Sequence, residues 1–283
     1  MGCGDVGLRV AGLFNRGVRV CALTSSPGRV AELRARGIVP LPGNLDTPST
    51  LRRLAGWATR VLHLVPPPAQ GWADLRTRAL IQALRRRTAP DVLVYGSTSG
   101  VYGNCAGALV HESRPIRPDT PRARRRADAE QTVRFMGRSA GVRVSALRIP
   151  GIYAPDRVGG TPRARLGRQT PVLRAQDDVY TNHIHADDLA RACVAALWRG
   201  AAQRVYNVND DSRLLMGDYF DLAADLYGMP RPPRVARDTA QQALPLSLLS
   251  FMSESRRLDN TRLKRELRLR LAYPSVHTGL VGG

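Results

Sequence analysis

The second to seventh residues of the chain read Gly-Cys-Gly-Asp-Val-Gly, which is the spacing G-x-G-x-x-G. In this spacing the first glycine makes a tight turn, the second lets the backbone approach a pyrophosphate, and the third allows close helix packing. A helix expected over 8–16 would point its N-terminal N–H groups at the phosphates. The loop therefore predicts a dinucleotide site, formed by Gly2, Gly4, Asp5, Val6 and Gly7.

An ordinary glycine-rich turn is the alternative explanation of this segment. Residues 18–23 read as a strand about one helix after the glycines. That spacing fits a βαβ unit, and it therefore favours the dinucleotide site.

The strand that should precede such a loop is absent from the given chain, because the loop starts at the second residue. In a doubly wound sheet that strand is the buried central one. We therefore expect a further apolar strand, of about five or six residues, to be encoded directly upstream of Met1.

Strand and helix patterns alternate after the loop, which indicates a parallel sheet covered by helices on both faces. We expect a Rossmann-like doubly wound α/β fold. Residues 1–150 would form the NAD(P)-binding domain and residues 151–283 a smaller C-terminal substrate lobe, from which about 184–208 returns to the sheet. The expected strands are 18–23, 38–41, 61–65, 92–95, 142–149 and 204–208. The expected helices are 29–36, 50–57, 73–87, 120–140, 187–198, 216–227 and 259–267, and 151–171 reads as a loop.

The net charge of +20 suggests nucleic-acid binding, but the origin of the charge argues against it. The excess is almost all arginine, with Lys264 as the single lysine, and the arginines are spread along the chain without interleaved aromatics. We therefore expect no nucleic-acid partner. No apolar run approaches the ~20 residues that span a bilayer, so we expect no membrane partner either.

The four cysteines are scattered and form no C-x-x-C pair, which predicts reduced thiols in a cytoplasmic protein. His183 and His185 would share one face of a strand and could ligate a metal. No third ligand is evident, and Asp187 or Asp188 fits the N-cap of the following helix. The sequence therefore predicts no metal site.

Five segments after the glycine loop carry a family resemblance. They are Gly-Ser-Thr-Ser-Gly-Val-Tyr-Gly at 96–103, His-Glu-Ser at 111–113, Ile-His-Ala-Asp-Asp-Leu-Ala at 184–190, Val-Tyr-Asn-Val at 205–208 and the closing region at 257–267. Together they resemble the extended short-chain dehydrogenases, the group of NAD-dependent epimerases and dehydratases. The resemblance runs along nearly the whole chain. It implies a protein that binds NAD(P) and carries out a redox, epimerase or dehydratase reaction.

The chain departs from this family where the resemblance implies a proton-transferring Tyr-x-x-x-Lys pair. Aligning 118–121 and 130–131 with the family pattern puts Arg122 at the tyrosine and Arg126 at the lysine. Arginine neither releases nor accepts a proton near neutral pH, so Arg122 cannot replace a phenol. Four residues apart on one helical face, the two would form an anion-binding pair in the cleft. A solvated basic helix face is the alternative.

The resemblance also implies that Thr98 orients a substrate carbonyl, although its hydroxyl fits equally well a cap of the turn after a strand. Tyr102, Tyr153 and His111 lie in the resembling segments and could replace the missing phenol. Each has a structural alternative, as a turn residue, a loop aromatic and an exposed loop side chain respectively.

In NAD-specific members of the family an acidic residue ends the second strand and binds the ribose 2′-hydroxyl. That position is Thr24 here, followed by Ser25, Ser26 and Arg29. Hydroxyls and a guanidinium could bind a 2′-phosphate that no carboxylate repels. The resemblance therefore favours NADP over NAD.

The resemblance further puts Asn44 near the adenine and Val65, at the end of a strand, beside the cofactor. We expect an atypical member of the group, an oxidoreductase or epimerase that acts on an anionic small molecule, with a homodimer as one assembly left open. The alternative is a non-catalytic dinucleotide-sensing protein that regulates a partner. The missing Tyr-x-x-x-Lys pair favours the sensor, whereas the full-length substrate lobe favours the enzyme.

Overall fold

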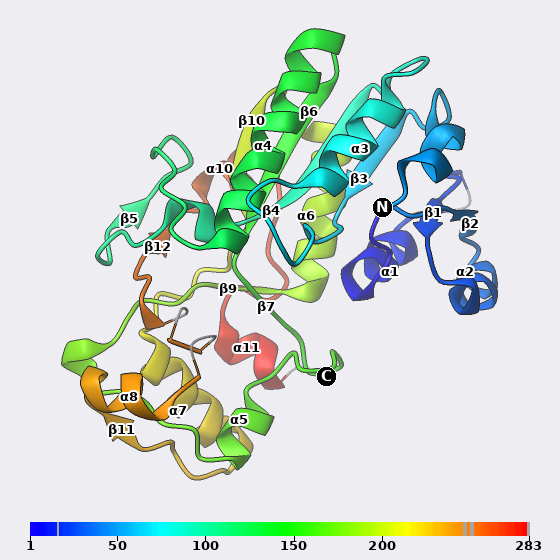
Figure 1. Ribbon diagram of the computed structural model, residues 1–283. Helices are drawn as coiled ribbons and strands as arrows, with labels where there is room; N and C mark the ends of the chain where they lie inside the picture. Colours follow the sequence, from blue (N-terminus) through cyan, green and yellow to red (C-terminus); the bar gives the residue numbers. More distant parts are fainter. Residues whose placement is uncertain (16, 246–247, 250–251, 282–283) are drawn as a thin grey trace.

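A parallel four-stranded sheet, in the order β10-β6-β4-β3, forms the centre of the computed structural model, which describes residues 1–15, 17–245, 248–249 and 252–281. A second parallel pair, β1 with β2, lies beside β3 (Figure 1). These parallel strands and their helices confirm the expected α/β fold. The strands are β1 (Cys21–Thr24), β2 (Val39–Pro42), β3 (Arg60–His63), β4 (Val92–Thr98), β6 (Arg143–Ile149) and β10 (Arg204–Asn207).

Helices cover both faces of the central sheet (Figure 1). Successive residues of a strand point to opposite faces, and β4 shows this directly. Leu93 is buried in one cluster with Leu80 and Val133, whereas Val94 is buried in another with Leu189. The helices of this layer are α1 (Asp5–Gly12), α2 (Val30–Ala35), α3 (Leu75–Leu84), α4 (Pro121–Ala140) and α6 (Ala186–Arg199).

A smaller lobe lies at the carboxyl end of the sheet, at the bottom of Figure 1, and has its own hydrophobic core. Its helices, with those of the C-terminal region, are α5 (Arg163–Gly167), α7 (Met216–Tyr227), α8 (Arg237–Ala243), α10 (Thr261–Glu266) and α11 (Val276–Val281). The remaining short elements are η1 (Pro27–Arg29), η2 (Pro48–Leu54), η3 (Ser99–Tyr102), η4 (Ala175–Asp177), β5 (Leu109–Val110), β7 (Gly151–Tyr153), β8 (Val172–Leu173), β9 (His183–His185), β11 (Arg234–Val235) and β12 (Arg257–Leu258).

Several local expectations differ from the structure. The helix expected over 8–16 is α1, which runs from Asp5 to Gly12, and the strand expected over 18–23 is β1, which begins only at Cys21. The helix expected over 50–57 is the 3₁₀ helix η2, which begins at Pro48. The loop expected over 151–171 contains β7 and α5. Within 184–208, β10 pairs with β6 of the central sheet, but β9 pairs with β7 instead.

A groove of about 760 Å³ separates β1 from β3. It lies next to Met1, whose backbone contacts Leu62 and Leu64 at the end of β3. The central sheet and the β1–β2 pair are therefore separate hydrogen-bonded units in the described residues.

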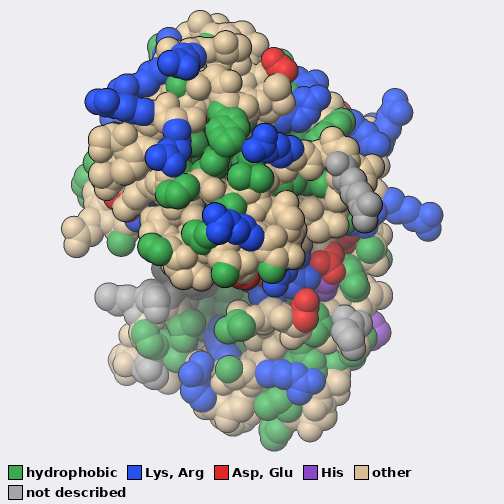
Figure 2. Space-filling view, turned by 90° about the vertical axis from the view of Figure 1, so that its right-hand side faces the viewer, with side chains coloured by type: hydrophobic (Ala, Val, Ile, Leu, Met, Phe, Trp, Pro, Cys, Tyr) green, Lys and Arg blue, Asp and Glu red, His purple; other side chains and the backbone are tan. Residues whose placement is uncertain are grey.

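The surface is rich in arginine, and Figure 2 shows Lys and Arg side chains scattered over one face of the molecule. Among the residues that the structure describes, no helix is both long and apolar enough to cross a membrane.

Buried titratable groups meet where β9 and the end of β10 face the lobe. The backbone N–H of Asp210 donates to the carbonyl of His183 at 2.8 Å, and one carboxylate oxygen of Asp210 accepts from the N–H of Ser212 at 2.9 Å. The other carboxylate oxygen is buried without a partner among the described residues. Burial raises the pKa of Asp210 to about 7 and lowers that of His183 to about 4.

The variant Asp210→Asn should change how stability depends on pH. Because the folded pKa of Asp210 lies above its unfolded value, the native state holds a proton between about pH 4 and 7 that the unfolded chain releases, so stability falls as pH rises through that window. His183 acts in the opposite sense, since its folded pKa is lowered. Urea unfolding should therefore show the stability difference, variant minus wild type, growing with pH by up to about 1.4 kcal/mol per unit. A difference that stays constant between pH 4 and 7 would contradict this assignment.

Candidate functional site

The three glycines of the segment 2–7 differ in why a residue without a side chain is needed at their positions. Gly2 has φ +76°, and a Cβ there would lie 2.8 Å from the backbone nitrogen of Val65. A Cβ on Gly7 would lie 2.7 Å from the carbonyl oxygen of Gly2. A Cβ on Gly4, in contrast, would have no heavy atom within 4 Å. Gly2 and Gly7 are thus needed because a Cβ would collide with the neighbouring backbone. At Gly4 the surface of the loop is open, so no protein atom would prevent a side chain there.

The loop leads directly into α1, whose N-cap is Gly4 and has no side-chain cap. The first-turn N–H groups therefore remain available to an anion at the positive end of the helix. The Asp5 carboxylate contacts the Nε atoms of Arg9 and Arg157, each at 3.1 Å. Val6 is half-buried against the cluster that includes Leu189. The Asp5 and Val6 side chains thus hold the helix in place, leaving the backbone of the loop to face a ligand.

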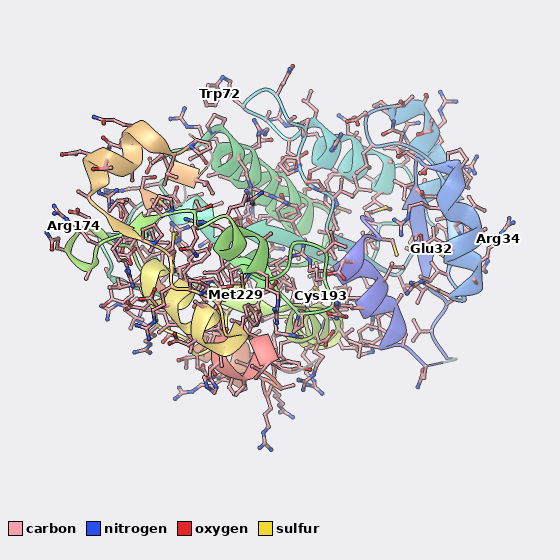
Figure 3. All side chains as sticks on the ribbon, turned by 90° about the horizontal axis from the view of Figure 1, so that it is seen from below. Glu32, Arg34, Trp72, Arg174, Cys193 and Met229 are labelled. Atoms are coloured by element: carbon pink, nitrogen blue, oxygen red, sulfur yellow. The ribbon has the colours of Figure 1, made fainter. Side chains whose placement is uncertain are left out.

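A tight turn follows β1 and carries the residues expected to select the cofactor. The Thr24 hydroxyl accepts from the N–H of Ser26 at 3.2 Å, while Ser25 is exposed. Arg29 reaches back to the glycine loop, where its Nη1 donates to the carbonyl of Cys3 at 2.7 Å. Its Nε donates to Glu32 at 3.1 Å, a residue of α2 that Figure 3 labels. The sequence did not predict this carboxylate, which stands beside the position expected for a 2′-phosphate.

Asn44 and Val65 follow β2 and β3. The side-chain oxygen of Asn44 accepts from the N–H of Asp46, and its own N–H donates to the hydroxyl of Thr50, both at 2.9 Å. Val65 is half-buried and touches the glycine loop at Gly2. The structure thus brings Val65 against the loop, while the hydrogen bonds of Asn44 shape its own turn.

Arg126 lies over the carboxyl ends of the central strands. Its Nη1 donates to the carbonyl of Gly96 at 2.7 Å, to the hydroxyl of Tyr95 at 3.2 Å and to the carbonyl of Val65 at 3.4 Å. Its Nε is buried without a partner among the described residues. The guanidinium of Arg126 therefore bridges β3 and β4 at the edge where the glycine loop also ends. Arg126 is thus not part of a fully solvated basic helix face.

Arg122 lies one helical turn earlier and is exposed. Desolvation of its guanidinium and the like charge of Arg126 lower its pKa, against a smaller opposing effect of Glu254. Neither Arg122 nor Arg126 forms an ion pair with a carboxylate in the described part of the chain. Two positive charges at one edge of the sheet are thus left without a bonded counter-charge.

Thr98 ends β4, and its hydroxyl accepts from the N–H of Gly100 at 3.3 Å. The residue is half-buried, and a Cβ at Gly100 would contact both Thr98 and Ala123. Thr98 therefore lies near the first turn of α4. Its hydroxyl caps the turn and still has a hydrogen to donate.

The groups that could replace the missing phenol are engaged elsewhere. The hydroxyl of Tyr102 donates to the side chain of Asn207 at 2.8 Å, and that of Tyr153 to the carbonyl of Ser275 at 3.1 Å. His111 is exposed and faces Asp259 at 3.6 Å. Tyr95 contacts Arg126, but it is fully buried, and burial raises its pKa. None of the four presents an accessible hydroxyl or imidazole beside Thr98 in these contacts.

His183 and His185 stand on β9, both buried. They stack on Tyr219 and Tyr273, at ring-centroid distances of 4.2 and 3.7 Å. In the described residues, no group of three His, Cys, Asp or Glu side chains could hold a metal ion. The helix cap expected at Asp187 or Asp188 is instead His185, whose Nδ1 accepts from the N–H of Asp187 at 3.2 Å.

A buried ion pair that the sequence did not predict holds α4 on the sheet. Glu130 accepts two hydrogen bonds from Arg148 of β6, at 3.1 and 2.8 Å, and a third from the hydroxyl of Ser97 at 2.6 Å. Arg148 and Glu130 expose only 4% and 3% of their side chains. A charged residue inside the apolar strand 143–149 was the available signal, because a buried charge requires a partner.

Known proteins resemble this chain in sequence. A model of the NAD dependent epimerase/dehydratase family matches residues 12–209. A UDP-glucose 4-epimerase from Azospirillum brasilense is 30% identical over 132 residues, which are 39% of this chain and 38% of that protein. The chain spans between 21% and 38% of the length of the curated relatives that it matches.

Solved structures match over nearly the full chain. A functionally unknown conserved protein from Silicibacter pomeroyi is 32% identical, with a TM-score of 0.83, and the match covers 99% of this chain and 94% of that one. A UDP-glucuronic acid 4-epimerase from Bacillus cereus, in complex with NAD, is 17% identical with a TM-score of 0.76, over 99% and 94% of the two chains. At that identity the second likeness shows the fold alone.

The variant Glu130→Leu should unfold at a much lower urea concentration than the wild type. It leaves the buried Arg148 guanidinium without its carboxylate, which costs about 3–5 kcal/mol of unfolding free energy. Adding Arg148→Met should restore part of that loss, since no buried charge then remains. Asp225→Asn, which breaks an exposed pair with Arg231, is the control and should leave the midpoint unchanged. Equal midpoints for Glu130→Leu and the control would show that the pair does not hold α4.

Proposed function

The chain belongs to the NAD-dependent epimerase/dehydratase family, and from this we propose that it binds a nicotinamide dinucleotide at the segment 2–7 and acts on an anionic sugar nucleotide. The observation that carries the proposal is the arrangement at the carboxyl edge of the sheet. There Arg126 bridges β3 and β4 beside the glycine loop, and Arg122 lies one turn away. Ligands of open α/β sheets bind at this edge.

The dinucleotide part of the proposal rests on the loop. Gly4 leaves an open face, and the uncapped N-terminus of α1 offers N–H groups to a pyrophosphate. Val65, at the end of β3, would close the pocket from the side of the sheet. When bound, a nicotinamide cofactor supplies hydride transfer. We assign this binding to residues 1–150, and we propose that the lobe 151–283 completes the substrate site at the edge of the sheet where Thr98, Arg122 and Arg126 lie.

We propose NADP rather than NAD as the preferred cofactor. The end of β1 carries hydroxyls at Thr24, Ser25 and Ser26 and no carboxylate, and Arg29 lies against the glycine loop. Glu32 is the opposing feature, because it already occupies the Nε of Arg29. The Nη atoms of Arg29 are the groups that would meet a 2′-phosphate.

The substrate part of the proposal rests on charge. Arg122 and Arg126 have no bonded carboxylate within the described residues, and their mutual repulsion contributes to the lowered pKa of Arg122. A phosphate or carboxylate of a ligand would relieve that repulsion and accept planar, paired hydrogen bonds. The relatives named above act on UDP-glucose or UDP-glucuronic acid. Thr98 would donate a hydrogen bond to a substrate oxygen at this place.

A non-catalytic dinucleotide sensor is the second candidate, and one observation favours it. The hydroxyls of Tyr102 and Tyr153 are bonded elsewhere, and in the alignment that the sequence suggests Arg122 takes the place of the proton-transferring tyrosine. The enzyme is favoured by the lobe, which keeps a complete core around α7 and α11. An enzyme would turn over a sugar nucleotide while the dinucleotide is bound, whereas a sensor would bind the dinucleotide without turnover.

The variant Gly4→Ala should weaken dinucleotide binding without lowering the thermal midpoint. Its new Cβ meets no protein atom but faces the position of the pyrophosphate. Titration of NADP and NAD by calorimetry measures this. In the same titrations, Arg29→Ala should cost NADP about 1.5–3 kcal/mol and leave the affinity for NAD unchanged. If Gly4→Ala bound dinucleotide as tightly as the wild type, the glycine loop would not be part of the binding site. If the wild type bound NAD more tightly than NADP, the proposed NADP preference would be wrong.

The variant Arg122→Ala should bind UDP-glucuronic acid about tenfold more weakly than the wild type, as expected for a lost hydrogen bond between charged groups. Arg138→Ala is the matched control, because it removes the same charge from the exposed far end of α4. Isothermal titration with the dinucleotide present measures both affinities. Equal losses in the two variants would mean a non-specific charge effect.

The double variant Arg122→Tyr/Arg126→Lys tests the choice between enzyme and sensor. A wild type that turns over its substrate through the arginine pair should lose activity, since the anion-binding pair is gone. A sensor has no activity to lose, and its dinucleotide affinity alone should respond. Activity that appears only in the double variant would identify the wild type as the sensor, because the phenol beside a lysine restores acid–base chemistry.

A further inference from the structure

Two arginines contact Asp5, the first residue of α1, and they differ in how firmly they are held. Arg9 is bonded to carboxylates through all three of its guanidinium nitrogens. Its Nε donates to Asp5 at 3.1 Å, its Nη1 to Asp187 at 2.6 Å and its Nη2 to Asp156 at 2.7 Å. Arg9 therefore anchors α1 to its neighbours, and each of its nitrogens already has an anionic partner.

Arg157 is held much less firmly. It lies in the segment 154–160, called the Arg157 turn below, which follows β7 and leads to α5 of the lobe. Its Nη1 donates to the carbonyl of Ile152 at 2.9 Å. Its Nε lies 3.1 Å from Oδ2 of Asp5, yet that buried oxygen accepts no hydrogen bond from the described residues. The charge of Arg157 is thus close to Asp5 without being fixed to it by a hydrogen bond.

The Arg157 turn is closed on itself and lies at the surface. The N–H of Ala154 donates to the carbonyl of Gly160 at 3.2 Å, and the N–H of Gly160 donates to the carbonyl of Arg157 at 2.9 Å. Val158, at its tip, is fully exposed. Asp156 ties the turn to α1 by an ion pair, but among the described residues no backbone hydrogen bond joins the two. The turn can therefore shift against α1 when side chains exchange partners.

The charges around the start of α1 do not balance. Asp5, Asp156 and Asp187 are the carboxylates of this cluster, whereas Arg9 and Arg157 are its cations. A pyrophosphate at the free N–H groups of the first turn would bring further negative charge close to Asp5. Of the two cations, only Arg157 has donors that no carboxylate of the described residues holds by a hydrogen bond. It is therefore the side chain available to neutralise such an anion.

We propose that Arg157 is a phosphate ligand of the dinucleotide, and that it turns from Asp5 to the pyrophosphate when the dinucleotide binds, which brings the Arg157 turn onto the glycine loop. Arginine holds phosphate by paired, planar hydrogen bonds, and the N–H groups of α1 complete the site. The inference rests on the proposed function, because it requires a dinucleotide at the glycine loop. It adds a residue outside 1–150 to that site. Since the turn leads into the lobe, a bound dinucleotide also fixes the entrance to the lobe.

Calorimetric titrations of the full chain with NAD, NADP and ADP-ribose test the assignment. Arg157→Ala should weaken the binding of all three about tenfold, as for a lost hydrogen bond between charged groups, because each carries the pyrophosphate. Arg168→Ala is the matched control, since it removes the same charge from an exposed position of the lobe and should bind like the wild type. Should Arg157→Ala not fold, as judged by circular dichroism, Arg157→Gln replaces it.

Two outcomes of these titrations separate this inference from the proposed function. Normal binding by Arg157→Ala beside weakened binding by Gly4→Ala would overturn the inference alone. A wild type that binds none of the three compounds would overturn the proposed function as well. Equal losses in Arg157→Ala and Arg168→Ala would mean a general effect of charge, and the assignment of Arg157 would then be wrong.

The variant Asp5→Asn distinguishes a phosphate ligand from a residue that only positions the loop. It removes the carboxylate that attracts Arg157 and repels the pyrophosphate, so it should bind NAD up to about fivefold more tightly than the wild type. If Arg157 served only to hold Asp5 in place, Asp5→Asn and Arg157→Ala would weaken binding alike, and the inference would fail. Arg157→Lys keeps the charge without the planar pair of donors, so its affinity should lie between those of the wild type and Arg157→Ala.

Trypsin reports on the turn itself, because it cleaves after arginine. The peptide bond between Arg157 and Val158 lies at the exposed tip of the turn, and the bond after Arg168 lies at the exposed end of α5. Saturating NAD should slow cleavage after Arg157 more than cleavage after Arg168, as followed by mass spectrometry of the released peptides. Equal slowing at both bonds would reflect stabilisation of the whole chain by a ligand, and the proposed closing of the Arg157 turn would be wrong.

Discussion

The buried ion pair between Glu130 and Arg148 is the constraint on which the candidate site depends. It joins α4 to β6, and through the Ser97 hydroxyl also to β4, so the register of the helix on the sheet is fixed. Arg126 and Arg122 lie toward the same side of α4, four and eight residues before Glu130 in the chain. Each step of four residues moves about one turn toward the carboxyl edge of the sheet. The ion pair of Glu130 with Arg148 therefore places Arg126 at the carboxyl edge of the sheet and Arg122 one helical turn further on.

The two arginines of α4 give this edge of the sheet a chemistry that differs from that of a tyrosine–lysine pair. A tyrosine beside a lysine exchanges protons, whereas two arginines hold a permanent positive charge. Arg126 offsets part of its desolvation by donating to the carbonyls of Gly96 and Val65 and to the Tyr95 hydroxyl. Arg122 has no such partners in the described residues. The two guanidiniums thus leave positive charge at this edge of the sheet, and neither of them exchanges protons near neutral pH.

The N-terminal unit is attached to the rest of the molecule without continuous strand pairing. Its links include the backbone of Met1 on β3, the packing of α1 on α6 and of η2 on α3, and the Arg9 side chain, which contacts Asp156 and Asp187 at 2.7 and 2.6 Å. Arg29 adds a link inside the unit, from η1 to the glycine loop. Side-chain contacts and the Met1 backbone therefore hold this unit, whereas a continuous ladder of hydrogen bonds joins β4 to β6.

The sequence by itself determined the class of fold, because hydrophobic periodicity and glycine spacing are local properties of the chain. The helix expected over 216–227 has those bounds in α7, and β4 begins at the expected Val92. The tertiary structure alone decided the partners: Glu32 beside Arg29, Arg148 against Glu130, and His185 instead of an aspartate as the cap of α6. It also decided that β9 pairs with β7 and that Asp210 is buried with an unpartnered oxygen. Glu130 and Arg148, and likewise β7 and β9, are separated by many positions in the chain, and the energies of buried groups come from desolvation, which no local pattern records.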